Sequence, residues 1–195
     1  MIDKKQAIEN LKDVQREFPR GFLAYGSALG AHRDGDVIDH DLDTDFGVFS
    51  EDFNFRSITN LVKKGFVIGH IFGMRYYGFE VSLTRGGVKT DVMVIYKSTI
   101  INKNASVGLS TFENKTFVKY WNCLWDNGGR NGLKDEIRHE YKEDVFSERK
   151  AIEIDGFSFS YFGIKYIEAV YGEEWMTPVK EWDWRTDHKC RKQDE

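Results

Sequence analysis

The chain has 195 residues, of which 41% are hydrophobic and 31% charged, and this composition is typical of one folded globular domain. Its 28 basic and 32 acidic residues leave a net charge of −4, which argues against a protein that holds nucleic acid through bulk phosphate neutralisation. The only two cysteines, Cys123 and Cys190, argue against a disulfide framework, and no run approaches the ~18 apolar residues of a transmembrane segment, so we expect a cytoplasmic protein.

The first elements form a helix, a strand and a turn. Apolar residues recur at helical spacing over residues 3–17 and predict an amphipathic helix. The apolar run Phe22 to Tyr25 predicts a short strand that turns at Gly26-Ser27, after which a short helix opens between Ala28 and Arg33. Backbone N–H groups at such a turn favour anions, and glycine lets a phosphate approach closely, although most Gly-Ser pairs are only turns.

Four carboxylates then occupy every second position. Asp39, Asp41, Asp43 and Asp45 lie within Val37 to Phe49, which we expect to run into a strand. A period of two places all four on one face of an extended strand. Like charges this close repel each other unless a cation lies among them, so the row predicts a divalent-metal site.

Later segments predict a helix over residues 56–64, then successive strands of one sheet over 66–72, 76–84 and 88–96. The last of these strands carries a single acid, Asp91, among apolar residues. An ionised carboxylate there is costly unless it is paired or binds a metal. A buried aspartate held by backbone donors is the structural alternative, and the acidic row favours a metal ligand.

The second half of the chain is less regular. We expect residues 98–149 to be irregular, with a strand over 115–122 and a turn-rich segment over 127–132. A helix is predicted over 161–171, followed by a tail that wraps the domain. Four acids in this half lack strand alternation around them and are interpreted as solvated: Glu143, Asp144, Glu153 and Asp155.

Two stretches carry a family resemblance. The run Tyr25 to Arg33, followed by Val37 to Val48, resembles the signature of the LicD and fukutin family, a part of the nucleotidyltransferase-fold superfamily. Tyr166 to Pro178 resembles the closing helix of that family and its Tyr-Gly followed by a proline turn. The resemblance implies an α+β fold, a nucleotidyltransferase-like mixed β-sheet flanked by helices, in a single domain over 1–195. Its catalytic core would span about 20–97 and its closing helical segment about 161–178.

This resemblance also implies a phosphotransferase that depends on Mg²⁺ or Mn²⁺. Such an enzyme moves a phosphorylated alcohol, such as phosphocholine or ribitol phosphate, from a CDP-activated donor to the hydroxyl of a glycan, free or lipid-linked, and releases CMP. One alternative keeps the fold and the metal but transfers a nucleotidyl group from a nucleoside triphosphate and releases pyrophosphate. Another is a nucleotide- or sugar-binding module without catalysis, although such a relative would be expected to lack one of the acids.

Matching the family motif residue by residue assigns site roles. Asp43 and Asp45 correspond to the metal-binding pair and Asp91 to the third acid, which would also accept the proton of the attacking hydroxyl. Gly26-Ser27 corresponds to the turn that a phosphate approaches. Arg33 falls where the family has an arginine and would bind donor phosphate, because its planar guanidinium suits bidentate contact.

The chain differs from the family motif at several positions. Asp39-His40 replaces a common Pro-Trp pair and Leu42 replaces a frequent aspartate, which leaves the donor's alcohol open. Asp41 is interpreted as support for the metal ligands, and His40 as a packing residue on the opposite face.

Two further groups of residues have both a functional and a structural interpretation. Basic side chains would meet phosphates or be solvated at a sheet edge: Lys89, Arg75 and Arg85. Aromatic side chains would stack on a cytosine or sugar or pack in the core: Tyr171, Trp175, Trp182 and Trp184.

Overall fold

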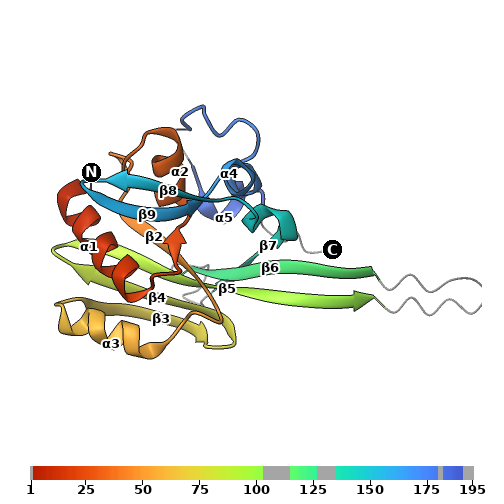
Figure 1. Cartoon of the computed structure of the whole chain (residues 1–195), viewed down its shortest axis with the longest axis horizontal. Coiled ribbons are helices and arrows are strands. Elements are labelled where there is room, and N and C mark those ends of the chain that lie inside the picture. Colours follow the sequence, from red (N-terminus) through yellow and green to blue (C-terminus); the bar gives the residue numbers. More distant parts are fainter. Residues whose placement is uncertain (1, 103–114, 127–134, 180–181, 191–195) are drawn as a thin grey trace, which may run out of the picture.

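The computed structural model describes residues 2–102, 115–126, 135–179 and 182–190 (Figure 1). The helices of these residues are α1 Lys4–Glu17, α2 Tyr25–Arg33, α3 Phe55–Lys63, α4 Ile164–Tyr171, α5 Trp184–Asp187 and the 3-10 helix η1 Glu143–Phe146. The strands are β1 Phe22–Leu23, β2 Asp43–Phe49, β3 Val67–Met74, β4 Tyr77–Arg85, β5 Val88–Asn102, β6 Lys115–Asp126, β7 Asp135–Lys142, β8 Arg149–Ile154 and β9 Phe157–Phe162.

The nine described strands form one mixed sheet. Its order is β3-β4-β5-β2-β1-β9-β8, and β6 pairs with the far part of β5 and with β7. Two pairs are parallel, β2 with β5 and β1 with β9, whereas the other pairs are antiparallel. Strands β5 and β6 extend together away from the rest of the domain (Figure 1). The predicted α+β class, with a mixed sheet flanked by helices, is confirmed.

Local signals explain the two helices predicted at the N-terminal end. In α1, the Asp3 side chain caps the helix by accepting from Gln6 N at 3.1 Å, and the apolar stripe that includes Leu11 is buried. In α3, Asn54 caps the first turn by accepting from Ser57 N at 2.9 Å. Gly65 follows the helix with φ +92°, a left-handed conformation that glycine adopts without steric cost.

The central strands confirm the predictions over 66–72, 76–84 and 88–96. Their two hairpins place β4 between β3 and β5, and β2 then joins β5 on its other side. The parallel register sets Asp45 opposite Asp91 and Thr44 opposite Thr90. Because side chains alternate, the acids share one face of the sheet, whereas the two threonines are buried beneath it and their hydroxyls are hydrogen-bonded at 2.9 Å.

The prediction that the acidic row lies on one strand was wrong. Strand β2 begins only at Asp43, and residues 39–42 form a turn and bend before it. The Asp39 side chain is 77% exposed and pairs with Lys4, and His40 is exposed. Alternation along a strand therefore applies to Asp43 and Asp45 alone, since a turn breaks the period of two.

The described part of residues 98–149, whose sequence pattern is irregular, contains more strand than the sequence indicated. The strand predicted over 115–122 is present as β6, but β7 follows it, and β8 and β9 form a further unpredicted hairpin. Asp155-Gly156 forms the turn of that hairpin with φ +50° and +67°, the geometry that an Asp-Gly pair favours. Glu143, Asp144, Glu153 and Asp155 are exposed, as expected of solvated acids. The predicted turn-rich segment over 127–132 lies outside the described residues.

The C-terminal elements return to the centre of the domain. Helix α4 starts later than predicted because residues 157–162 belong to β9, and it ends at Gly172 with φ +83°. The chain then passes α5 and comes back beside α4, where Lys189 N donates to Val170 O at 2.8 Å (Figure 1). This return places His188 against the Tyr25 ring at the start of α2.

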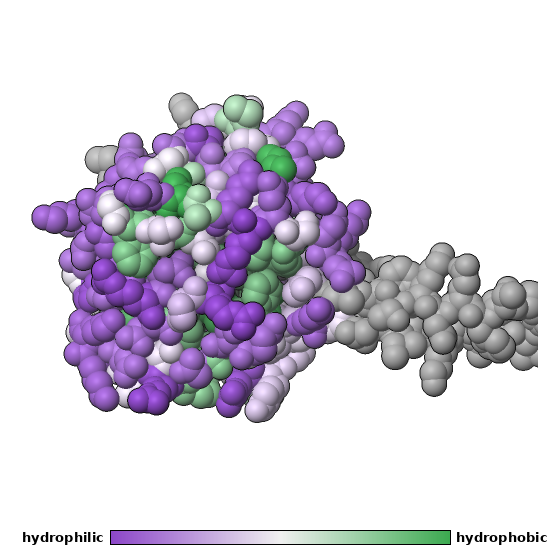
Figure 2. Space-filling model, viewed as in Figure 1, coloured by the Kyte–Doolittle hydropathy of each residue, from purple (hydrophilic) through white to green (hydrophobic). Residues whose placement is uncertain are grey.

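The surface, the helix lengths and the cysteines can be compared with what the composition predicted. The face shown in Figure 2 is mainly hydrophilic, with small separate areas of apolar side chains. Among the described residues, every helix is too short or too polar to cross a membrane. Cys123 and Cys190 are both buried as free thiols.

Candidate active site

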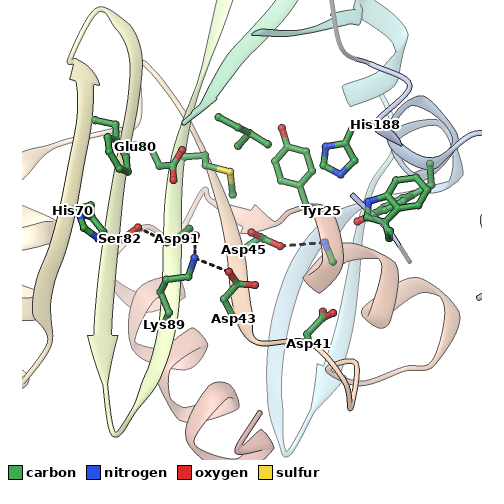
Figure 3. Close-up of a pocket in the computed structure, with 16 residues that line it drawn as sticks. Tyr25, Asp41, Asp43, Asp45, His70, Glu80, Ser82, Lys89, Asp91 and His188 are labelled. Atoms are coloured by element: carbon green, nitrogen blue, oxygen red, sulfur yellow. Dashed lines mark hydrogen bonds and ion pairs between the residues drawn. The ribbon is translucent and has the colours of Figure 1, made fainter. Parts of the chain in front are cut away.

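The acids that the sequence singled out meet at the centre of the sheet. Strand β2 carries Asp43 and Asp45, and the neighbouring β5 carries Lys89 and Asp91 in the same register. Figure 3 shows these side chains projecting toward one another at the floor of a pocket. The parallel pairing of β2 with β5 thus brings together three carboxylates that lie up to 48 positions apart in sequence (Asp43 and Asp91).

The start of α2 lies directly against these acids. Gly26 N donates to Asp45 Oδ2 at 3.2 Å, and Ser27 Oγ accepts from Asp45 N at 2.9 Å. A Cβ on residue 26 would lie only 2.8 Å from Asp41 Oδ2, so a larger residue at this position would displace the Asp41 side chain. The predicted Gly-Ser turn is therefore the first turn of α2 itself, and its serine supports the β2 backbone from outside the pocket lining.

Tyr25 holds this helix start in a strained conformation. Its φ of +38° is rare for a residue with a side chain and costs of the order of ~1–3 kcal/mol. Tyr25 N donates to Tyr166 OH at 3.2 Å, and its phenol lies 2.8 Å from both His139 Nδ1 and Tyr141 OH. This buried network from α4 and β7 fixes the backbone that places Gly26 against Asp45.

Lys89 is the counter-ion of the carboxylates. Its Nζ lies 2.7 Å from Asp43 Oδ2 and 2.8 Å from Asp91 Oδ2, and Ser82 donates to the other oxygen of Asp91 at 2.5 Å. Burial by itself would lower the pKa of Lys89, but the charges of Asp91 and Asp43 outweigh it and raise that pKa. Lys89 therefore stays charged between two acids.

Three acids of the site have raised pKa values. Burial, and then the charges of Asp43, Asp91 and Asp41, raise the pKa of Asp45 well above its usual value. Burial followed by the charge of Asp43 raises the pKa of Asp41 to about 6. Burial also raises the pKa of Asp91, although Lys89 and Ser82 oppose it. The cluster holds more negative charge than one lysine balances, which favours the entry of a further cation.

The donor set suits a hard cation. Carboxylate oxygens are the ligands that Mg²⁺ and Mn²⁺ take, and the Lys89 ammonium already lies as a positive charge between Asp43 and Asp91. As they stand, the described side chains include no group of three acids, histidines or cysteines arranged closely enough to hold a metal. A metal on Asp43 and Asp91 would therefore require Lys89 to move.

A pocket of about 450 Å³ opens above the acids. One wall comes from β3, β4 and β5 and includes His70, Phe72, Glu80, Ser82 and Met93. The opposite wall comes from the start of α2 and the C-terminal segment and includes Tyr25, Tyr171, Trp182 and His188. Figure 3 shows His70 and Glu80 on one side of Asp91 and Asp45, with Tyr25 and His188 on the other. Size and lining fit a small ligand with a charged part over the acids.

Comparison with known proteins places this site in a family. The family model described as LicD/FKTN/FKRP, nucleotidyltransferase domain, matches residues 20–161, which is well over half of the chain. The chain belongs to the LicD/FKTN/FKRP family. The family resemblance expected from the acidic motif is thereby confirmed, and the matched residues contain Asp43, Asp45, Lys89 and Asp91.

Individual relatives share a low sequence identity with the chain. The chain is similar to the ribitol-5-phosphate transferase FKTN of Mus musculus, with 24% identity over 181 residues, 92% of this chain and 34% of that protein. The Homo sapiens protein of the same name is 24% identical over 165 residues, 84% of this chain and 31% of that protein. An uncharacterized protein of Caenorhabditis elegans is 27% identical over 198 residues, 95% of this chain and 47% of that protein. The chain spans about a third of the transferases named here.

Some residues considered for the site of this family domain lie elsewhere. Arg33 forms a bidentate pair with Asp34 at 2.7 and 2.8 Å and is not part of the pocket lining. Arg85 pairs with Asp13 at 2.7 Å and covers the Phe66 ring, so it joins the sheet to α1. Arg75 lies exposed in the turn between β3 and β4. Of the three basic residues weighed for phosphate contact besides Arg33, Lys89 alone lines the pocket.

Several residues that line the pocket carry no functional signal in the sequence. His70, Glu80, Ser82 and Met93 reach the pocket only because β3 and β4 pair beside β5. His188 lies in a charged tail with no motif around it. Two of the four aromatic residues considered for stacking do line the pocket, Tyr171 and Trp182, whereas Trp175 packs on the His32 ring.

Proposed function

We propose that this family domain catalyses the metal-dependent transfer of a phosphorylated alcohol from a CDP-activated donor to a glycan hydroxyl, with release of CMP. The observation that carries the proposal is the convergence of Asp43, Asp45 and Asp91 beneath a pocket bordered by the start of α2. Two relatives are named for ribitol-5-phosphate transfer, which makes ribitol phosphate the first alcohol to test.

Phosphoryl transfer demands charge neutralisation and positioning more than covalent chemistry. The acceptor hydroxyl oxygen would bond to the phosphorus that carries the alcohol while the bond from that phosphorus to the CMP oxygen breaks. A bound Mg²⁺ or Mn²⁺, held by Asp43, Asp45 and Asp91, would supply charge stabilisation at the phosphate oxygens. Lys89, which pairs with Asp43 and Asp91, would be displaced by such a metal and would then offer its positive charge to the same phosphates.

The acceptor proton must pass to a base at the pocket. We expected Asp91 in this role, yet both of its oxygens are engaged, by Ser82 and by Lys89. Asp41 also lines the pocket, and its pKa of about 6 suits proton acceptance near neutral pH. We assign the proton to Asp41 and the support of the metal and Lys89 to Asp91.

An assay of products tests the proposal. The chain would be incubated with Mg²⁺, a panel of glycan acceptors, and either CDP-ribitol, CDP-choline or nucleoside triphosphates. Release of CMP with a modified glycan supports the proposal, whereas pyrophosphate release supports nucleotidyl transfer. Asp43→Asn should abolish turnover and Asp39→Asn, an exposed neighbour in the same acidic row, should retain it. Equal activity of Asp43→Asn and the unmodified chain would contradict a catalytic role of the cluster.

A further inference from the structure

The wall opposite β3 and β4 is built from aromatic rings of the C-terminal segment. Tyr171, at the end of α4, has its ring centroid 5.1 Å from that of Trp182 and 5.7 Å from that of His188. The His188 ring in turn stacks on Tyr25, with centroids 5.0 Å apart and planes inclined by 15°. All four side chains line the pocket. Three of them lie beyond residues 20–161, the part of the chain that the family model matches.

This segment is held against the domain by its backbone. Lys189 N donates to Val170 O, and Glu140 N donates to Cys190 O, each at 2.8 Å. The two bonds tie the residues that follow His188 to α4 and to β7. The aromatic rings are therefore positioned before any ligand enters, which reduces the entropy that a ligand would lose in ordering them.

Two nitrogen atoms of this wall lack a partner. Trp182 Nε1 and His188 Nδ1 are buried and have no hydrogen-bond partner among the described residues. His188 is only 5% exposed. An indole N–H can only donate, and a neutral imidazole offers one donor and one acceptor. Buried polar atoms are nearly always paired in native proteins, so these two nitrogens indicate partners that a ligand supplies.

The charge distribution around the pocket identifies the part of the ligand that belongs here. Carboxylates and Lys89 lie on the floor, whereas Tyr25, Tyr171, Trp182 and His188 are uncharged. Burial lowers the pKa of His188 to about 4, so its ring is neutral at physiological pH. A nucleotide has the matching polarity, since its phosphates are charged and its base is flat, uncharged and rich in hydrogen-bonding atoms at its edge.

We propose that Tyr171, Trp182 and His188 form a subsite for the pyrimidine base of the nucleotide donor. The base stacks on the aromatic wall, and Trp182 Nε1 and His188 Nδ1 complete their hydrogen bonds at its edge. This proposal rests on the proposed function only in requiring a nucleotide-linked donor. It assigns to the C-terminal segment the recognition of the base, and to β2 and β5 the handling of the phosphates.

Binding measurements on the full chain test the subsite. Titration calorimetry with Mg²⁺ present would compare CMP with ribitol 5-phosphate, which shares the phosphate but has no base. Trp182→Phe keeps a ring and removes the N–H, and should weaken CMP binding about fivefold. His188→Phe should act in the same way, and Trp182→Leu should weaken CMP binding about tenfold or more through lost stacking. None of the three should change the affinity for ribitol 5-phosphate.

Two further observations make the test independent of folding. Trp175→Phe is the matched control, because that indole packs on His32 outside the pocket, and it should leave CMP binding unchanged. In a ¹⁵N spectrum of the five indole N–H groups, the signal that Trp182→Phe removes should shift on addition of CMP and stay in place with ribitol 5-phosphate.

The outcomes separate the subsite from the proposed function. Unchanged CMP affinity in Trp182→Phe and His188→Phe would overturn the subsite, even if the product assay still shows CMP release. Loss of ribitol 5-phosphate binding instead of CMP binding would also overturn it and place the alcohol on this wall. Pyrophosphate release combined with weakened CMP binding would overturn the proposed reaction and retain the subsite. A chain that binds no CMP would overturn both.

Discussion

Asp45 is a residue whose charged form suits the proposed metal site but destabilises the metal-free fold. Its side chain is half-buried, accepts a hydrogen bond from Gly26 N, and lies among three other acids, Asp41, Asp43 and Asp91. Burial and these neighbours disfavour its charged form, which is the form that a metal requires. A side chain of the same shape without charge should therefore suit the metal-free fold better than aspartate does.

Asp45→Asn is expected to stabilise the protein and remove its activity. The free energy of unfolding at pH 7 should rise by about 1 kcal/mol, because the amide keeps the Gly26 contact without like-charge repulsion. Transfer activity should fall at least about a hundredfold, since a metal ligand is lost. Urea unfolding and the CMP-release assay measure the two effects. Asp39→Asn is the control, and a less stable Asp45→Asn protein would contradict the electrostatic account.

The pH dependence of that stability difference has a defined sign. A carboxyl whose folded pKa is raised binds a proton more tightly in the folded state, so it destabilises the fold as pH rises above its usual value of 3.8. Below that pH both forms are neutral, and the unmodified chain and Asp45→Asn should be equally stable. The advantage of Asp45→Asn should grow as pH rises above about 4, and urea unfolding across pH 3–8 measures it. A difference that shrinks with rising pH would argue against a raised pKa.

Lys89→Met tests whether the lysine competes with a metal. Without the ammonium between Asp43 and Asp91, Mn²⁺ should bind about tenfold more tightly or better, and the metal-free protein should unfold at a lower temperature. Calorimetric titration with Mn²⁺ and thermal unfolding give the two values. Lys150→Met, which removes an ion pair with Glu148 at 3.1 Å, is the control. Unchanged or weaker Mn²⁺ binding in Lys89→Met would contradict competition.

At the scale of elements, the start of α2 is the part that joins fold and site. The strained Tyr25 precedes Gly26, whose backbone N–H donates to Asp45 of β2. The sequence indicated a phosphate-approach turn here, because strand, Gly-Ser and helix follow one another within a few residues. It placed the helix start at Ala28, since it could not show the distant phenol of Tyr166 that pairs with Tyr25 N.

Gly26→Ala should impair the site without unfolding the domain. The added Cβ would lie 2.8 Å from Asp41 Oδ2 and 3.5 Å from Asp45 Oδ2, and would displace the Asp41 carboxylate from its place beside Asp45. We expect activity to fall at least about tenfold while the free energy of unfolding changes by about 1 kcal/mol or less. Gly69→Ala in β3 is the control, because its Cβ would be no closer than 3.7 Å to any neighbour. Full activity of Gly26→Ala would show that the close approach is dispensable.

The helices and strands that carry a strong local sequence pattern were predicted. The strands that are defined by hydrogen bonds to a neighbouring strand were not. Helices α1 and α3 carry a cap, an apolar stripe and a stop signal, and β3 to β5 are apolar runs separated by glycines. Strand β7 reads as a charged segment, and β8 alternates exposed and part-buried residues. Their strand conformation comes from hydrogen bonds to β6 and β9, which no local pattern reveals.

At the scale of the whole molecule, long-range pairings close the domain around the site. Strand β1 pairs in parallel with β9, so the chain end that carries α4 returns to the N-terminal strand. Tyr166 then reaches Tyr25 across 141 positions, and His188 stacks on the same tyrosine. The C-terminal segment is therefore part of the pocket and not an appendage.

Tyr166→Phe tests this closure. Loss of the hydroxyl leaves Tyr25 N without its acceptor in a buried position, which should lower the free energy of unfolding by about 1–3 kcal/mol. Activity should fall as well, because Tyr25 positions Gly26. Chemical unfolding and the transfer assay measure both, and Tyr76→Phe, at an 80% exposed residue, is the control. A stable variant with full activity would show that the Tyr25 backbone holds its conformation unaided.

The family and the mixed α+β class could be predicted from the sequence, because motif spacing and apolar runs are local signals. The same kind of signal makes Asp43, Asp45 and Asp91 the predicted acids of the site. The alternation of the acids did not show that Asp39 lies in a turn and Asp43 in a strand, since a turn and a strand can carry the same spacing of acids. The folded structure was needed to show that Lys89 lies between the acids, that Arg33 pairs with Asp34, and that His188 reaches the pocket. Those contacts depend on strand register and chain return, which are properties of the folded domain alone.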